Sequence, residues 1–145
     1  MLSALVSVAA ADPQASTLRS YAVEGDAIAA SLTGEAGDAS RGAQLLQQRQ
    51  KSLCVLCHSG PFPDSHLHGT IAPDLTGVGS RLSAGQLRLR IVDMKRLNGT
   101  SIMPTYYAMF ANDGDSRIAA GWRGKPILNA DEIEDLVAYL QTLKQ

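Results

Sequence analysis

The chain has 145 residues, of which 45% are apolar, 5% aromatic and 19% charged, and its net charge is −1. This length suits one domain, and the composition excludes a fully disordered chain. No run of 18 apolar residues is present, so we expect no membrane span, and the balanced charge gives no indication of a nucleic-acid partner. The small aromatic share suggests that a bound group completes the core.

The chain begins with an apolar segment. Residues 1–11, MLSALVSVAAA, end in small residues and resemble the apolar core and cleavage site of an export signal, without its basic start. An ordinary N-terminal segment is the alternative interpretation. Residues 12–37 contain several glycines and show no sustained period. We therefore expect residues 1–37 to form an extended arm and residues 38–145 to form the domain.

The two cysteines follow a first predicted helix, which begins at Asp38, a residue that can cap it, and runs to about Lys51. They lie in the run CVLCH at 54–58. C-x-x-C-H is the attachment motif of a c-type haem, because two thiols on one helical turn can bond both vinyl groups of a porphyrin. The adjacent histidine supplies the proximal ligand of the iron. We therefore predict one covalent haem c, held by Cys54, Cys57 and His58.

Three other interpretations of the cysteine pair are weaker. A dithiol redox centre is expected near a βαβ pattern, and the sequence does not show one. A zinc site needs about four ligands, and adding His66 or His68 to residues 54–58 gives a spacing that is typical of no common zinc finger. A disulfide across so short a loop would remove little chain entropy.

Long irregular stretches follow the motif. Residues 59–80 are rich in proline and glycine, and wrapping around a large cofactor would explain an irregular stretch of this length. Residues 98–128 are also irregular, and the turn residues at 112–114 favour a small hairpin.

Two further helices complete an all-α chain. The first is expected over residues 84–97, where Ser83 and Gln86 resemble a capping box. The last follows Asn129, with Glu132 at the matching capping-box position. Its apolar stripe consists of Ile133, Leu136, Val137, Leu140 and Leu143.

Met103 is the favoured ligand for the second axial position of the iron. It lies 45 positions after His58, and the proline that follows it favours an extended backbone that can direct the sulfur at a metal. A core-filling methionine is the alternative. The other candidates, which lie too close to His58 in the chain or suit other roles, are His66, His68, Met94 and Met109. The carbonyl of Pro73 is the candidate acceptor for the second ring nitrogen of His58, and a simple turn proline is the alternative.

Charge is unevenly distributed along the chain. Residues 81–98 carry five basic residues and one acidic residue, whereas residues 1–40 carry one basic residue and five acidic residues. Such asymmetry can steer a charged redox partner. It can equally belong to solvated helix faces, and the sequence leaves both interpretations open.

Several segments together resemble the SoxX family, the monohaem cytochrome subunits of the SoxAX complex of bacterial sulfur oxidation. The resemblance runs from about Tyr21 to Leu143, and its motifs are specific in combination. They are CVLCHSGPFP at 54–63, APDLTGVGSR at 72–81, GQLRLRIVD at 85–93, IMPTYY at 102–107 and RGKPIL at 123–128.

The resemblance implies a periplasmic protein with a class I cytochrome c fold, in which three main helices and long loops wrap the haem. It implies close contact between the first and last helices at Gly42 and Tyr139. It also implies a single haem c with His/Met-ligated iron, for which the matching residues are Cys54 and Cys57 for the thioether bonds, His58 for the proximal ligand and Met103 for the distal ligand.

The resemblance further implies a heterodimer with SoxA. That complex is an L-cysteine S-thiosulfotransferase, which oxidatively joins thiosulfate to a cysteine of the SoxYZ carrier and releases two electrons. This chain is expected to accept those electrons from SoxA and to pass them to a downstream cytochrome c. Because haem attachment consumes both cysteines, the sulfur-transfer nucleophile must lie on another chain. The alternatives are a freestanding periplasmic monohaem cytochrome c that shuttles electrons and a haem sensor with an open iron position.

Overall fold

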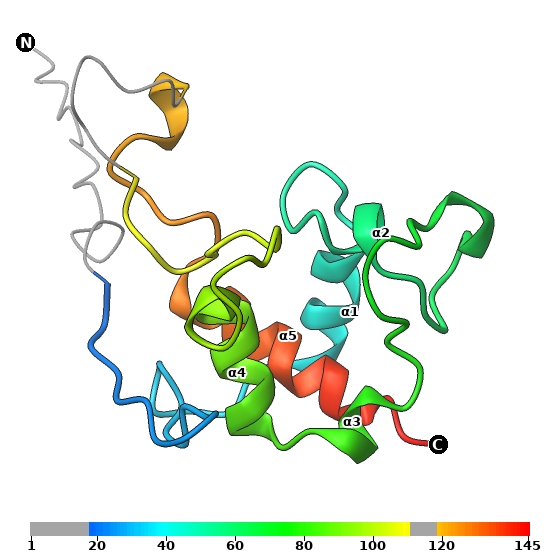
Figure 1. Cartoon of the computed structure of the whole chain (residues 1–145), viewed down its shortest axis with the longest axis horizontal. Helices are drawn as coiled ribbons and strands as arrows, with labels where there is room; N and C mark the ends of the chain where they lie inside the picture. The colour runs from blue at the N-terminus through cyan, green and yellow to red at the C-terminus, as the bar shows by residue number, and fades with distance from the viewer. Residues whose placement is uncertain (1–17, 111–118) are drawn as a thin grey trace, which may run out of the picture.

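The computed structural model describes residues 18–110 and 119–145, and its regular elements are helices (Figure 1). The predicted export-signal segment at 1–11 and the predicted turn at 112–114 lie outside the described residues. In the described part of the chain, the only β-type pairing is an isolated bridge between Glu24 and Ala27. The elements are α1 (Ala39–Leu46), α2 (Cys54–Cys57), η2 (Ser65–Leu67), α3 (Val78–Arg81), α4 (Ala84–Asp93), η3 (Met94–Arg96), η4 (Ala120–Trp122) and α5 (Ala130–Thr142).

Three longer helices form the framework. Figure 1 shows α5 in the middle of the molecule, with α1 and α4 packed against it. The buried residues of α5 include Ile133, Leu136, Val137 and Leu140, which belong to the stripe expected from the sequence. None of the described helices is long and apolar enough to cross a membrane.

The starts of these helices follow the predicted capping chemistry. The Asp38 side chain accepts a hydrogen bond from the backbone of Arg41 at the start of α1. Complete capping boxes start α4 and α5, formed by Ser83 with Gln86 and by Asn129 with Glu132. Each of these side chains satisfies an amide that has no partner within the helix.

The first helix is shorter than the sequence predicts. It ends at Leu46, whereas we expected it to reach Lys51. Residues 47–50 are exposed and polar, so they offer no apolar face to pack against α5. The chain instead forms a turn, in which the hydroxyl of Ser52 donates to the carbonyl of Leu46 at 3.1 Å.

Gly42 lets α1 cross α5 at close range. A Cβ at this position would overlap the backbone carbonyl of Asp135 and lie 2.8 Å from the Cβ of Tyr139. The guanidinium of Arg41 binds Asp135 with two hydrogen bonds, of 2.7 and 2.8 Å. The contact at Gly42 and Tyr139 that the resemblance implied is therefore present.

The described part of the N-terminal arm packs onto α4 and α5. Ile28 and Leu32 belong to the buried core. A buried ion pair joins Arg88 of α4 to Glu134 of α5, with N–O distances of 2.7 and 2.9 Å. The same two side chains bind the arm, because Arg88 donates to the carbonyl of Ile28 and Glu134 accepts from the amide of Leu32.

Three of the five basic side chains in residues 81–98 form ion pairs within the fold. Arg88 is buried against Glu134, Arg90 lies 3.4 Å from Asp26, and Arg96 lies 3.7 Å from Asp93. Of these pairs, that of Arg90 with Asp26 joins the basic segment to the acidic N-terminal segment.

Candidate haem site

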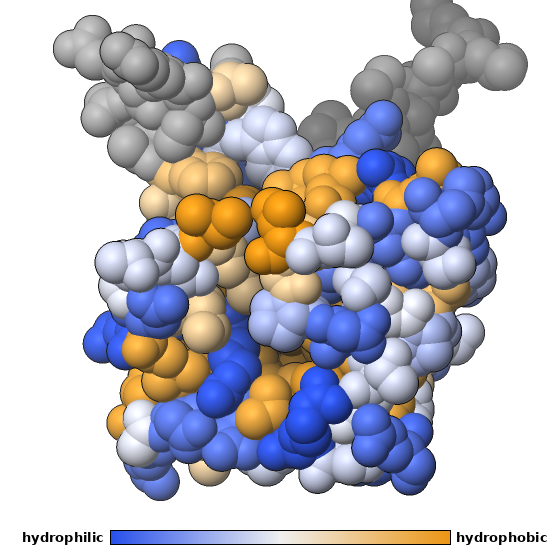
Figure 2. All heavy atoms as spheres, turned by 45° about the vertical axis from the view of Figure 1, so that its right-hand side comes forward, coloured by the Kyte–Doolittle hydropathy of each residue, from blue (hydrophilic) through white to orange (hydrophobic). Residues whose placement is uncertain are grey.

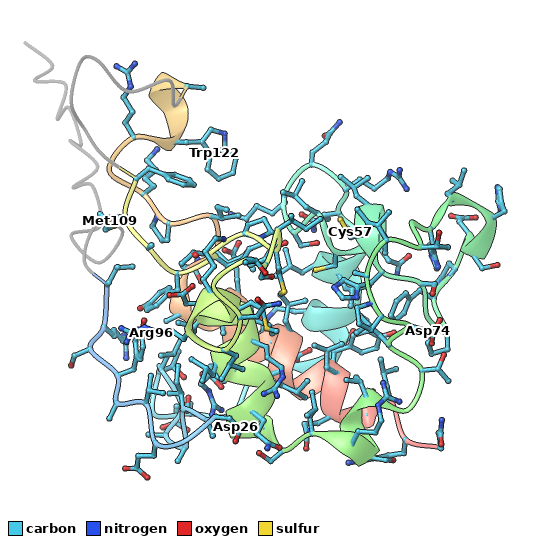
Figure 3. All side chains as sticks on the ribbon, in the orientation of Figure 1. Asp26, Cys57, Asp74, Arg96, Met109 and Trp122 are labelled. Carbon is cyan, nitrogen blue, oxygen red and sulfur yellow. The ribbon has the colours of Figure 1, made fainter. Side chains whose placement is uncertain are left out.

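The attachment motif lies on the single turn of α2. Both cysteines are free thiols and half-buried, and Figure 3 shows Cys57 on this turn. The turn begins after Leu53, whose φ of 63° is left-handed. Burial raises the pKa of the Cys54 thiol above its ordinary value. A thiol whose pKa is raised lacks the activation that a dithiol redox centre requires, which disfavours that alternative.

His58 follows α2, and its ring is held through Nδ1. Its Nδ1 lies 2.7 Å from the carbonyl oxygen of Pro73. A carbonyl oxygen only accepts, so Nδ1 is the donor, and Nε2 is the ring nitrogen left for a metal. Metal-bound histidines are usually fixed in this way through the other ring nitrogen. That Nε2 binds iron stays a prediction.

The segment that contains Pro73 is hydrogen-bonded to the attachment motif and to the residue after it. The amide of Ala72 donates to the carbonyl of Cys57 at 3.0 Å, and the amide of Leu75 donates to the carbonyl of Ser59 at 2.9 Å. These backbone bonds place Pro73 beside His58, although the two residues are 15 positions apart.

Asp74 adds a side-chain connection that sequence reasoning missed. Its carboxylate accepts from the hydroxyl of Ser59 at 2.6 Å and from the amide of Thr76 at 2.7 Å. These hydrogen bonds lower the pKa of Asp74 from 3.8 to about 2. Ser59 directly follows His58, and Asp74 directly follows Pro73. The contact between Ser59 and Asp74 therefore joins the same two segments as the contact between His58 and Pro73. No sequence signal except the neighbouring Pro73 indicates it.

His66 and His68 lie in the loop that follows the motif. His68 Nε2 lies 3.0 Å from the carbonyl of Pro63, and its ring lies 5.5 Å from that of Phe62. Across residues 18–110 and 119–145, no three histidine, cysteine or acidic side chains form a group able to hold a metal ion. The zinc alternative therefore finds no donor set in this part of the chain.

Met103 lies in the loop between η3 and Tyr106. Its side chain is partly buried and packs against the hydrophobic core. Its backbone amide donates to the hydroxyl of Ser101 at 3.2 Å, and its carbonyl accepts from the ammonium of Lys95 at 2.9 Å. Met109 is exposed, and Figure 3 shows it away from Cys57. The assignment of Met103 as the distal ligand stays a prediction.

A groove of about 340 Å³ opens next to the attachment motif. It lies between the residues that precede α2 and the chain that leads into α5. Trp122, labelled in Figure 3, is one of the residues that line it. The lining is mostly apolar and consists of Gln50, Lys51, Leu53, Phe110, Trp122 and Ile127.

Exposed apolar side chains surround the motif. We call Leu56, Leu67 and Ile71 the apolar rim. Gly69 allows the loop that carries Leu67 and Ile71 to cross α2 closely, because a Cβ there would overlap the carbonyl of Leu56. Ile71 is 71% exposed. Figure 2, in which the right-hand side of Figure 1 comes forward, shows apolar side chains among the polar ones at the surface.

The side chains of this site fit a c-type haem. Two thiols on one helical turn match the attachment chemistry, and an imidazole held through its Nδ1 follows them directly. A half-buried thioether on a separate loop can supply a sixth ligand, and thioether sulfur is a known partner of histidine on haem iron.

Comparisons with known proteins agree with this fit. The cytochrome c family model matches residues 39–144. A chain in the crystal structure of SoxXA from P. pantotrophus matches with a TM-score of 0.74 and 38% identity, over 86% of this chain and 95% of that chain. A search of curated proteins found no match. The all-helical fold with three main helices expected from the sequence is confirmed.

Proposed function

Because the chain belongs to the cytochrome c family, we propose that it is the electron-transfer subunit of a SoxAX-type complex. The family makes it a cytochrome c electron carrier, with Cys54 and Cys57 as the residues that would hold haem c. The observation that supports its assignment to a SoxAX-type complex is the 38% identity, over 86% of this chain, to a chain of a SoxXA structure.

The residues of the site suit electron transfer without substrate chemistry. A bound haem would supply a reversible one-electron change at its iron. His58 and Met103 would hold the iron, which would leave no protein-free position on it for a substrate. The thioether bonds would use both thiols, so this chain would keep no sulfur nucleophile. In the proposed complex, SoxA joins thiosulfate to a SoxYZ cysteine, and this chain accepts the electrons and passes them to a downstream cytochrome c.

The apolar rim is the surface that we propose for contact with SoxA. Exposed apolar side chains that gather on one face of a soluble protein often mark an interaction site. Leu56 lies between the two attachment cysteines, and Ala72, the neighbour of Ile71, is hydrogen-bonded to Cys57. A partner docked on the rim would therefore lie beside the attachment motif, where the path for an electron is short. We place this complex in the periplasm, on the basis of the haem-attachment motif and the export-like N-terminal residues.

Copurification tests this proposal. The full chain is matured with haem in a periplasm and co-expressed with a tagged SoxA, and haem-stained gels report the complex. We expect the chain to copurify with SoxA, and Ile71→Glu to weaken the complex without changing the haem spectrum. Val23→Glu is the matched control, because Val23 is an exposed apolar residue on the arm (37% exposed). A chain that stays monomeric beside SoxA would instead support the freestanding shuttle.

A further inference from the structure

We infer that Lys95 is a positioning residue for Met103, and this inference rests on the proposed ligation of haem iron by Met103. The Lys95 ammonium donates a 2.9 Å hydrogen bond to the backbone carbonyl of Met103. The side chain thus reaches from η3, which directly follows α4, to the backbone of the residue proposed to bind iron, eight positions later.

A second contact, two residues after Met103, holds the same loop to the same turn. The hydroxyl of Thr105 donates to Oδ1 of Asp93 at 3.0 Å, and the backbone amide of Lys95 donates to that same oxygen at 3.2 Å. The loop is therefore attached to the turn at Asp93–Lys95 at Met103 itself and again two residues later, at Thr105. Neither attachment uses the methionine side chain, which leaves the sulfur free to act as a ligand.

The turn itself is held by the core. Leu89 and Val92 of α4 are fully buried, and the amide of Tyr107 donates to the carbonyl of Val92 at 3.3 Å. By contrast, the loop before Met103 is exposed, and Ile102 is 77% exposed. Burial therefore fixes the turn, whereas the exposed residues before Met103 contribute little. The polar contacts of Lys95 and Thr105 add to the packing of the Met103 side chain against the core in holding this residue in place.

Such positioning matters because a thioether is a neutral ligand that an added imidazole can replace. Replacement requires the loop to leave its bound position, so every contact that holds the loop lowers the apparent affinity for imidazole. An exposed hydrogen bond from a charged donor is a modest contribution. We expect its loss to tighten imidazole binding about three- to tenfold.

The experiment titrates imidazole into the ferric, haem-loaded full chain. The readout is the weak near-infrared band expected of methionine-ligated ferric haem. Lys95→Met should bind imidazole about three- to tenfold more tightly than the unmodified chain, whereas Lys95→Arg, which keeps a charged donor, should stay closer to it. Thr105→Val removes the second attachment and should shift the affinity in the same direction.

Lys144→Met is the matched control. Lys144 also donates from its ammonium to a backbone carbonyl, that of Gly79, at 2.5 Å. It follows the C-terminal end of α5, whereas the loop that carries Met103 meets the chain just before α5, where the amide of Leu128 donates to the carbonyl of Tyr106. This variant loses the same charge and the same type of bond, and its imidazole affinity should not change.

The outcomes distinguish failure of this inference from failure of the proposed Met103 ligation and of the proposed function. If the unmodified chain shows the band but neither Lys95→Met nor Thr105→Val changes the imidazole affinity, Lys95 is not a positioning residue. An equal shift in Lys144→Met also overturns the inference, because the effect would then come from charge or general stability. If the unmodified chain lacks the band and binds carbon monoxide rapidly, the ligation by Met103 fails and the inference fails with it. Copurification with SoxA tests the proposed function independently of all three results.

Discussion

The hydroxyl of Tyr106 donates a hydrogen bond of 2.5 Å to the backbone carbonyl of Ser52, 54 positions earlier in the chain. Tyr106 follows Met103 by three residues, and Ser52 precedes Cys54 by two, so this bond joins the segment of the proposed distal ligand to the attachment motif. Both residues are buried. Burial, and to a smaller extent the neighbouring cysteine thiols, raise the pKa of Tyr106 well above its usual value. The hydroxyl therefore stays protonated and can donate.

Tyr106→Phe should destabilise the fold by about 1–3 kcal/mol, because it leaves the buried Ser52 carbonyl without this donor. Denaturant unfolding of the haem-loaded chain measures the change. Tyr107→Phe is the control, since the Tyr107 hydroxyl accepts from the amide of Arg19 in the exposed arm, and its loss should cost less. Equal effects of the two variants would contradict the importance of the bond between Tyr106 and Ser52.

Gly42→Ala should destabilise the packing of α1 on α5. Alanine favours a helix by about 1 kcal/mol over glycine, but overpacking typically costs about 1–3 kcal/mol or more. The steric cost should prevail, because the new Cβ meets the backbone of Asp135, which cannot rotate away. Thermal unfolding is the measurement. Gly121→Ala has open space around it and should leave the midpoint nearly unchanged.

Met103→Ala should abolish the near-infrared band of methionine-ligated ferric haem, since it removes the proposed ligand sulfur. Absorption spectra of the oxidised protein check this result. Met109→Ala should retain the band, because Met109 is exposed and lies away from the attachment motif (Figure 3). A band that survives in Met103→Ala and disappears in another methionine variant would show that the ligand is assigned to the wrong residue.

Asp74 should make stability depend on pH in the acid range. Its pKa in the folded chain, about 2, lies below its ordinary value of 3.8, so its contribution is complete above about pH 4 and is lost as the pH falls toward 2. Asp74→Asn should therefore be less stable than the unmodified chain at pH 5, and the two should converge near pH 2. Urea midpoints measured at intervals between pH 5 and pH 2 report this convergence, and parallel curves would contradict it.

The features predicted correctly from the sequence depend on residues close together in the chain. The capping boxes at Ser83 and Asn129 join residues three positions apart, and the CVLCH run at 54–58 requires a single helical turn. The end of α1 was predicted wrongly, because a capping residue indicates where a helix can start, whereas its length depends on the apolar surface available on α5.

The sequence by itself determined the attachment chemistry and the starts of the helices, because these follow from local spacing and backbone hydrogen bonding. Only the tertiary structure decided that Tyr106 meets Ser52, that Lys95 reaches Met103 and that Arg88 is neutralised by Glu134. Such contacts arise when α1, α4 and the loops pack around α5. Their partners come from distant parts of the chain, and no local pattern of residue types specifies which distant group each side chain will meet.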